Sequence, residues 1–409
     1  MTTAVSARKF VSSFASLTVL AAMPALLSTQ AAAAAPVAYV YVQTNPGVNV
    51  YSVNAAGQLT LVKGSPFADS GQMEGNNGSY LIAVGTDDLH SYKIETNGAV
   101  GPQAAQIDTQ SYDGAQCGNT NGGTPNGAQF DHTGKDFYVQ LYGAPGSGGV
   151  YAACAAWQSY RIESDGAFTF LGAIEYSGYA GHDASQSSIP TVSSNDSFAY
   201  GVFQEYSGYS DTAFSTFTRT SSGELEANNG FTEKDPAANP NMAGGPWYYF
   251  PELVQADPAG HLAVMLVSES FNNCCGAYGP EQLASYTING SGGVSSTNTW
   301  QNMPTPAFSS ATSMDMSPSG KLLAVAGAPG LQVFHFNGAS PITAFGEPLL
   351  TNVTIDQLAW DSSNHLYALS YSSSELYVYT ATPTGITPVS GSPYKVTGAY
   401  GIKGMIVVN

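Results

Sequence analysis

Glu252 has the chemically most suggestive surroundings in this 409-residue chain. It directly follows five residues with ring side chains, Trp247 to Pro251, in a segment rich in Gly and Pro. Aromatic faces beside a carboxylate suit a sugar-like ligand, and a carboxylate can act as a general base. We therefore predict that Glu252 is a catalytic base and that Trp247, Tyr248 and Tyr249 bind substrate. The alternative is that these rings only plug the mouth of a channel.

The usual catalytic signatures are missing from the sequence. It has no Gly-x-Ser-x-Gly elbow, His-Glu-x-x-His pair, phosphate-binding glycine loop or EF-hand calcium loop. Among the 6 histidines, only His182 lies in a long loop of the face on which we place the site. We predict His182 as the one candidate histidine base, with an ordinary surface residue as the alternative. Any active site must therefore be assembled from separate parts of the chain.

A repeat supplies the elements that would position such a site. In each copy an aromatic residue begins an alternating stretch, and a turn that usually contains glycine follows six residues later. Alternation that leads into an Asn-Gly or Asp-Gly type of turn predicts a β-hairpin. In one imperfect copy the turn is Ala339-Ser340, where Ser340 replaces the glycine. The seven copies begin at Tyr51, Tyr92, Tyr160, Phe217, Tyr286, Phe334 and Tyr379.

A second element, a short turn followed by an apolar strand, precedes most of these hairpins. Its clearest copies start at Asp131, Asp257 and Ser317. Each period therefore holds an inner strand, a tight turn and three further strands, which is the composition of a four-stranded propeller blade. The sequence predicts an all-β, seven-bladed β-propeller that forms a single domain over residues 36–409.

The two ends of the chain are suited to close the propeller ring. The stretch from Met405 to Val408 has the composition of an inner strand with no blade after it. The stretch from Val37 to Val42 resembles a second strand with no inner strand before it. We predict that these strands share one blade. Residues 68–79 hold little that resembles the inner strand that the second blade needs.

The entry of each inner strand should face the central channel. Counting five residues back from the Asp or Ser that opens each inner turn gives Asn126, Ser188, Glu252, Thr312 and Asp356. We predict that Asn126 and Thr312 bind substrate and that Asp356 is a catalytic residue with an orienting role. No cofactor is expected, with calcium held by Glu252, Asp356 and Asn126 as one alternative. The other alternative is that these polar groups only solvate a wet channel.

Extra residues are concentrated in connections that should share one face of the propeller. In a four-stranded blade, the connection from the second to the third strand and that from the outer strand to the next blade emerge together. Insertions on a single face usually mark the binding side, and neutral loop growth is the alternative. The long segments are residues 103–125, 143–157, 175–190, 205–213, 231–251 and 270–282.

All four cysteines lie in these long segments. Cys117 and Cys154 belong to two loops of one blade, so a disulfide between them is geometrically reasonable in an oxidising compartment. Cys274 and Cys275 are adjacent, and they could form a vicinal disulfide or pair elsewhere. We favour disulfides that staple loops over redox chemistry.

The first 35 residues are typical of a signal peptide. Arg8 and Lys9 precede an apolar stretch, and alanines at 31–35 offer cleavage sites. We expect an exported protein, periplasmic or extracellular, without a transmembrane segment. Loss of Arg8 and Lys9 would change the net charge from −18 to −20, which argues against nucleic acid as a partner. A small molecule or glycan is the expected ligand, with a protein partner on the loop face as an alternative.

Two motifs connect this sequence to a known family. They are the Asp/Ser-Pro-x-Gly-Lys/His turns, Asp257 to His261 and Ser317 to Lys321, and the Tyr-x-Val/Ile strand before an x-Gly turn. The pattern resembles the lactonase family of seven-bladed propellers, which includes 6-phosphogluconolactonase, over nearly all of residues 36–409. The resemblance implies the propeller fold and lactone hydrolysis.

The arginines indicate the charge of the substrate. Relatives that act on phosphorylated or carboxylated lactones would be expected to hold the anion with Arg or Lys. After the leader the chain has only Arg161 and Arg219, and both lie in repeat strands. We therefore expect a lactonase-like propeller that hydrolyses an uncharged, sugar-type lactone. The alternative is a non-catalytic propeller whose long loops recognise a glycan, an envelope component or a protein.

Overall fold

The described residues contain strands, turns and no helix. The computed structural model describes residues 34–68, 71–109, 124–142, 155–176, 183–187, 190–206, 210–240, 247–270, 277–308, 310–396, 398 and 401–409. The strands all belong to the compact unit Pro36–Asn409. No helix long and apolar enough to cross a membrane occurs in these described ranges.

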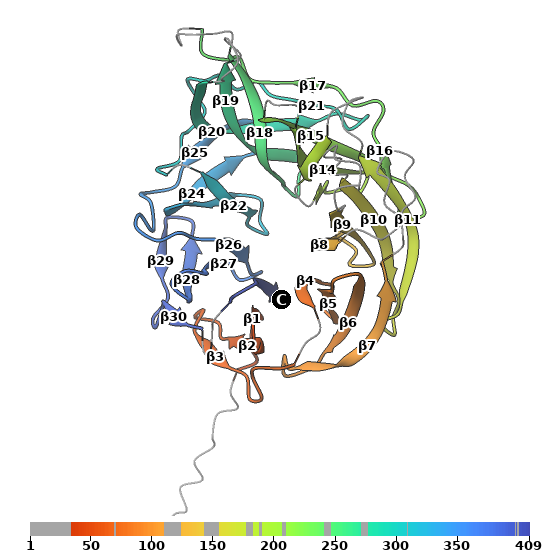
Figure 1. Cartoon of the computed structure of the whole chain (residues 1–409). Helices are drawn as coiled ribbons and strands as arrows, with labels where there is room; N and C mark the ends of the chain where they lie inside the picture. The colour runs from red at the N-terminus through yellow and green to blue at the C-terminus, as the bar shows by residue number, and fades with distance from the viewer. Residues whose placement is uncertain are drawn as a thin grey trace, which may run out of the picture. The chain divides into compact units, whose positions relative to one another are not determined.

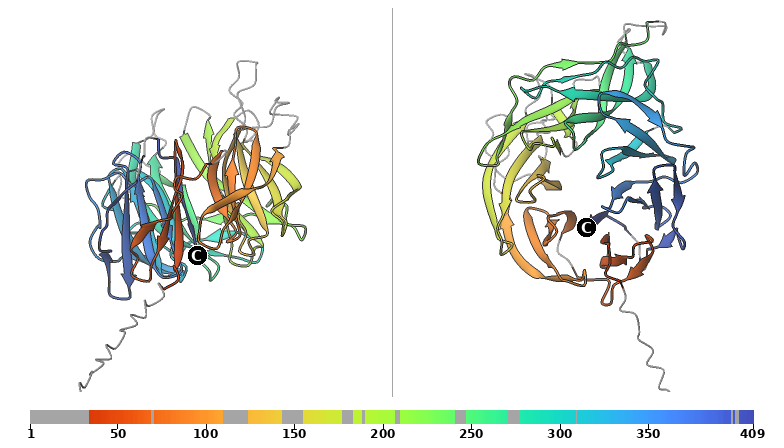
Figure 2. Two further views of the ribbon diagram at one scale, coloured as in Figure 1. Left: turned by 90° about the horizontal axis from the view of Figure 1, so that it is seen from below. Right: turned by 180° about the vertical axis from the view of Figure 1, so that it is seen from behind.

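The strands form seven sheets around a central axis, and in most sheets the strand order follows the chain (Figure 1). Each sheet is a blade built on four antiparallel strands, to which β13 (Thr191–Val192), β17 (Glu233–Lys234) and β30 (Tyr394–Lys395) add short extra pairings. Figure 2 shows the same ring from the side and from behind. The fold is the predicted all-β, seven-bladed propeller.

From the axis outward, blade 1 contains β31 (Gly404–Val408), β1 (Ala38–Thr44), β2 (Gly47–Val53) and β3 (Leu59–Leu61). Blade 2 contains β4 (Gln72–Asn76), β5 (Tyr80–Val84), β6 (Asp88–Ile94) and β7 (Val100–Asp108). Blade 3 contains β8 (Thr124–Phe130), β9 (Asp136–Tyr142), β10 (Ala155–Ile162) and β11 (Phe168–Tyr176). Blade 4 contains β12 (Asp183–Ser187), β13 (Thr191–Val192), β14 (Phe198–Tyr206), β15 (Ser210–Arg219) and β16 (Leu225–Ala227).

Blade 5 contains β18 (Trp247–Ala256), β19 (His261–Ser270), β20 (Ala277–Ile288), β21 (Val294–Ser295) and β17 (Glu233–Lys234). Blade 6 contains β22 (Ala311–Met316), β23 (Leu322–Gly327), β24 (Gly330–Asn337) and β25 (Ser340–Ala344). Blade 7 contains β26 (Gln357–Trp360), β27 (His365–Ser370), β28 (Glu375–Thr382), β29 (Gly385–Pro388) and β30 (Tyr394–Lys395).

The chain ends close the ring as predicted. Strand β1 pairs with β31 in antiparallel register, with Val40 opposite Val407. Side-chain amides then join neighbouring blades: Gln357 Nε2 donates to the Met405 carbonyl at 2.9 Å, and the Met405 amide donates back to Gln357 Oε1 at 2.7 Å. These two reciprocal hydrogen bonds link blade 7 to blade 1, in the way that paired backbone amide and carbonyl groups link adjacent strands of a sheet.

The core lies between the faces of neighbouring blades. None of the seven aromatic residues that open the repeats exposes more than 5% of its surface. Between blades 3 and 4, for example, the rings of Trp157 and Phe217 lie 4.8 Å apart. Full burial of a large apolar side chain contributes roughly 1.5–3 kcal/mol, so the repeated aromatic residue stabilises every blade interface.

The inner strand of blade 2 is β4, which lies within the stretch where the sequence showed little sign of a strand. Of its five residues only Met73 is buried. Glu74, Gly75 and Asn76 lack the apolar character of the other strands. An inner strand that borders a channel needs few apolar residues, which explains why the pattern was weak here.

The two faces of the ring differ in their connections. The inner turns and outer hairpin turns lie on one face, which we call the turn face; on it, Asp257 Oδ1 accepts the His261 amide at 2.7 Å. One turn differs from the prediction: Asn337 pairs with Ser340, so the hairpin turns at Gly338 and Ala339. The opposite face, which we call the loop face, carries the connections from second to third strands and between blades.

Candidate active site

Five of the seven inner strands carry a β-bulge, and three of the predicted residues lie in one. The register shifts in β8, β18 and β22 fall at Asn126 with Gly127, at Glu252 and at Thr312. Bulges re-aim side chains and often occur beside active sites. Counting back from the inner turn thus located a structurally equivalent position in these three blades.

The other two bulges fall on residues that sequence reasoning did not choose. In β4 the shift falls at Glu74, which was missed because this strand was not recognised. In β12 it falls at Ser185, whereas the predicted Ser188 lies outside the described residues. The spacing from the inner turn differs in these blades, so a fixed count does not reach the bulge.

Glu252 lines an open pocket of about 810 Å³ on the loop face, between blades 5 and 6. Much of the remaining lining is apolar, with Pro306, Phe308 and Pro329 among its residues. Thr305 and Thr351 add hydroxyl groups, and the described lining contains no lysine or arginine. The pocket therefore offers a carboxylate, two hydroxyl groups and an apolar surface to a small ligand.

The environment of Glu252 tunes its acidity. Burial, followed by the negative charges of Glu281 and Glu269, raises the pKa of Glu252 to about 7. The carboxylate of Glu281 is fixed in place, because its two oxygens accept the amides of Ser310 at 2.8 Å and Ala311 at 3.0 Å. A carboxyl group with a pKa near neutrality can take up and release a proton at physiological pH, as a general base must.

Asp356 and Thr312 are engaged elsewhere in the structure. Asp356 precedes β26 of blade 7, and its Oδ2 accepts the Tyr371 amide at 2.7 Å. The Thr312 hydroxyl donates to the Ile355 carbonyl at 2.6 Å, so it joins blade 6 to blade 7. Blade 6 separates Asp356 from Glu252, and none of the hydrogen bonds or ion pairs between described residues connects the two.

The predicted aromatic residues line a different pocket, of about 570 Å³, on the blade 4 side of β18. Trp247 is partly buried, Tyr248 exposes 50% of its surface and Tyr249 is buried. The Tyr249 hydroxyl donates to Gln282 Oε1 at 3.2 Å. Strand β18 thus places the rings and Glu252 in neighbouring pockets rather than in one.

Several predictions fall on residues that the structure does not describe. His182, Cys117, Cys154, Cys274 and Cys275 all lie outside the described ranges, and Asn126 is described by its backbone alone. The histidine base, the disulfides and the calcium alternative therefore stay predictions. Within the described residues, no group of three or more His, Cys, Asp or Glu side chains could hold a metal ion.

Two further carboxyl groups of the inner strands have raised pKa values, and sequence reasoning singled out neither. Burial raises the pKa of Glu74 to about 7, against the lowering effect of its hydrogen bond with Gln72. Burial likewise raises the pKa of Asp315 to about 7, against hydrogen bonds from two backbone amides. Both residues keep part of their surface accessible, so water moderates the effect.

Solved structures of low sequence identity share this architecture. The periplasmic gluconolactonase of Pseudomonas aeruginosa matches with a TM-score of 0.57 at 13% identity, over 91% of this chain and 99% of its own. This chain shares the seven-bladed propeller fold of that structure. Provisionally assigned 6-phosphogluconolactonases from Bacteroides fragilis and Bacteroides uniformis match this propeller with TM-scores of 0.55, at 13% and 11% identity, over 91% of this chain and 98% and 99% of theirs. Neither a protein-family model nor a curated protein sequence matches the chain, and fold alone does not define chemistry.

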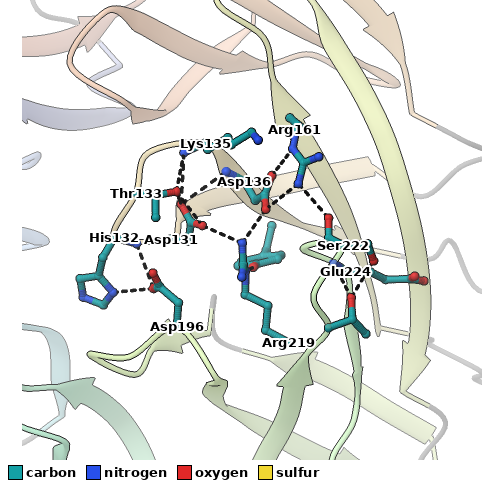
Figure 3. A network of polar contacts seen from close by, with 12 residues as sticks. Asp131, His132, Thr133, Lys135, Asp136, Arg161, Asp196, Arg219, Ser222 and Glu224 are labelled. Carbon is teal, nitrogen blue, oxygen red and sulfur yellow. Dashed lines mark hydrogen bonds and ion pairs between the residues drawn. The ribbon is translucent and has the colours of Figure 1, made fainter.

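Both arginines of the propeller stabilise the interface between blades 3 and 4 on the turn face (Figure 3). Arg219 Nη2 contacts Asp136 Oδ2 at 2.6 Å and Asp131 Oδ2 at 3.0 Å. Arg161 Nε contacts Asp136 Oδ1 at 2.7 Å, and its Nη2 donates to the Ser222 carbonyl at 2.8 Å. Neither guanidinium is therefore available to hold an anionic ligand in the Glu252 pocket.

Proposed function

We propose that this protein is a lactonase-like hydrolase that opens an uncharged lactone, with Glu252 as the general base. One observation carries the proposal: Glu252 lies at a bulge of the inner strand, in an open pocket, with a pKa raised to about 7. The likeness to a periplasmic gluconolactonase supports the same reaction class. Asp356 has no part in the proposal, since its carboxylate holds the Tyr371 amide.

The reaction needs one water molecule and a shuttled proton. The Glu252 carboxylate takes a proton from water while the water oxygen bonds to the lactone carbonyl carbon. The hydroxyl groups of Thr305 and Thr351 line the pocket and can donate to the oxyanion that forms. When the ring C–O bond breaks, Glu252 returns its proton to the leaving alkoxide, and the product is the open-chain hydroxy acid.

The substrate class follows from charge. Neither arginine faces the pocket, and the described lining contains no lysine. The neighbouring Glu281 and Glu269 would repel a phosphate or carboxylate on the substrate. We infer a neutral, sugar-type lactone. We also infer that the protein works after export to the periplasm or the cell exterior, in line with the signal-peptide pattern of its first 35 residues.

The experiment is a kinetic comparison of the native protein and Glu252→Gln. We expect hydrolysis of at least one of γ-butyrolactone, δ-valerolactone and glucono-δ-lactone, and little hydrolysis of 6-phosphogluconolactone. Glu252→Gln should lower kcat by about 100-fold or more, the contribution typical of a general base. Glu226→Gln, an exposed glutamate on β16, is the matched control and should keep full activity. If the native protein hydrolyses none of these lactones, the non-catalytic binding function replaces this proposal.

A further inference from the structure

The pocket on the blade 4 side of β18 is separate from the Glu252 pocket. It is bounded by β15, by β17 with the residues that follow it, and by the first residues of β18. The two pockets have no lining residue in common, although Pro251 and Glu252 are consecutive. A ligand in this pocket would therefore not occupy the proposed site of hydrolysis.

Aromatic surface is exposed in this pocket. Tyr248 is 50% exposed, and the only other exposed large hydrophobic residues in the described ranges are Leu61 and Phe170. Trp247 and Phe250 line the same cavity and are partly buried. Ring faces open to solvent beside a cavity can stack on the C–H face of a ligand.

A pair of carboxyl groups forms the opposite wall. Glu233 and Asp235 hydrogen-bond to each other, and Asp235 Oδ1 accepts the Tyr286 hydroxyl at 2.9 Å. Both residues are exposed; partial desolvation of the Glu233 carboxyl group, then its contact with Asp235, raises the pKa of Glu233, so the pair gives up its last proton less readily than two separate carboxyl groups would. It therefore carries less negative charge than two free carboxylates and offers both a donor and acceptors.

Two polar atoms beside the pocket have no partner among the described residues. They are the indole Nε1–H of Trp247 and the Oγ1 of Thr212, and neither has appreciable accessible surface. An unsatisfied buried polar group costs about 1–3 kcal/mol. A ligand that reaches these atoms after a small side-chain adjustment would remove that cost, and the indole N–H requires an acceptor on the ligand.

From this geometry we propose that the pocket formed by Thr212, Glu233, Asp235, Trp247, Tyr248 and Phe250 is a binding site for an uncharged saccharide. Sugar hydroxyl groups both donate, to the carboxyl pair, and accept, from the indole N–H and the threonine hydroxyl. An organic cation could stack on the rings but would give the indole N–H no acceptor. An anionic sugar is disfavoured by the acidic wall. The inference does not rest on the proposed hydrolysis.

The test is isothermal titration calorimetry of the purified protein with maltohexaose, cellohexaose, chitohexaose and mannohexaose, and with tetramethylammonium chloride. We expect one of the sugars to bind with a Kd below about 1 mM. Because Tyr248 is exposed, Tyr248→Ala should fold normally and weaken binding about tenfold, as should Glu233→Gln. Phe170→Ala and Glu226→Gln, which alter exposed residues of β11 and β16, are the matched controls and should bind as the native protein does.

The proposal is overturned if none of the four sugars binds, whether or not tetramethylammonium does, or if Tyr248→Ala leaves sugar binding undiminished. Glu252→Gln separates this site from the catalytic one, because it should bind the sugar with unchanged affinity. Loss of sugar binding in Glu252→Gln would show that the sugar lies in the Glu252 pocket, and it would overturn the second site.

Discussion

Burial, and after it the negative charge of Glu281 in the same loop-face pocket, raises the pKa of Glu252, while the Glu281 carboxylate is itself held by the amides of Ser310 and Ala311. The backbone at the start of β22 therefore fixes a negative charge beside the proposed base. A base surrounded by fixed negative charge binds its proton more tightly, so the pocket sets the pH at which Glu252 works.

The first prediction concerns the pH dependence of lactone hydrolysis. Because the base must be deprotonated, kcat should rise with pH and reach half its maximum near the Glu252 pKa of about 7. Glu281→Gln removes one negative charge and should move that midpoint to lower pH, while Glu226→Gln should leave it in place. Initial rates between pH 5 and pH 9 measure the midpoint. A Glu281→Gln profile identical to that of the native protein would contradict this assignment of the base.

The second prediction concerns the buried ion pairs of Arg219. The Asp131 and Asp136 side chains are at most 1% exposed, and Arg219→Ala would remove the arginine that pairs with Asp131 and one of the two that pair with Asp136. The expected loss is about 3–5 kcal/mol in the free energy of unfolding, measured by urea denaturation. Arg161→Ala should cost less, because Arg219 still pairs with Asp136 and the Arg161 side chain is 25% exposed. Equal losses in the two variants would rule out this account.

The third prediction concerns Gly223, which lies in the outer turn of blade 4. Its φ of 99° is unfavourable for any residue with a Cβ. A Cβ at this position would also overlap the Asp136 carboxylate that binds both arginines. Gly223→Ala should therefore lower the melting temperature, whereas Gly385→Ala, with open space around its Cβ, should change it little. Thermal unfolding followed by circular dichroism makes the comparison.

The fourth prediction concerns stability against pH. Asp315 has a folded-state pKa raised to about 7, so the folded protein keeps this proton while the unfolded chain loses it at lower pH. The stability that the folded protein gains from binding this proton is fully present below the unfolded-state pKa of about 4. It is lost as the pH rises from there to about 7. Asp315→Asn should thus match the native protein near pH 4 and be more stable at pH 8, by on the order of 1–2 kcal/mol. Denaturant unfolding at both pH values tests it, and equal stability at pH 8 would contradict it.

The repeat was sufficient to predict the fold because it marks the residues that every blade must bury. Tyr160 and Phe217 belong to neighbouring copies, and both lie in the core between blades. The pattern did not predict β4, because Glu74 and Asn76 of this strand border the channel and the strand lacks an alternation of apolar residues. It also misplaced the turn at Ala339-Ser340, because the hairpin uses the left-handed conformation of Gly338 one position earlier.

The sequence by itself determined the class of fold, the closure of the ring by its two ends and the position of Glu252 in an inner strand. These follow from local patterns of burial, turn chemistry and spacing. Only the tertiary structure decided that Glu252 and the rings of Trp247 and Tyr248 line different pockets, that Asp356 serves its own blade, and that Glu233 pairs with Asp235. The physical reason is that pockets form between blades, where residues far apart in the chain meet. The repeat pattern within one blade does not show which side of its strands each adjacent blade covers.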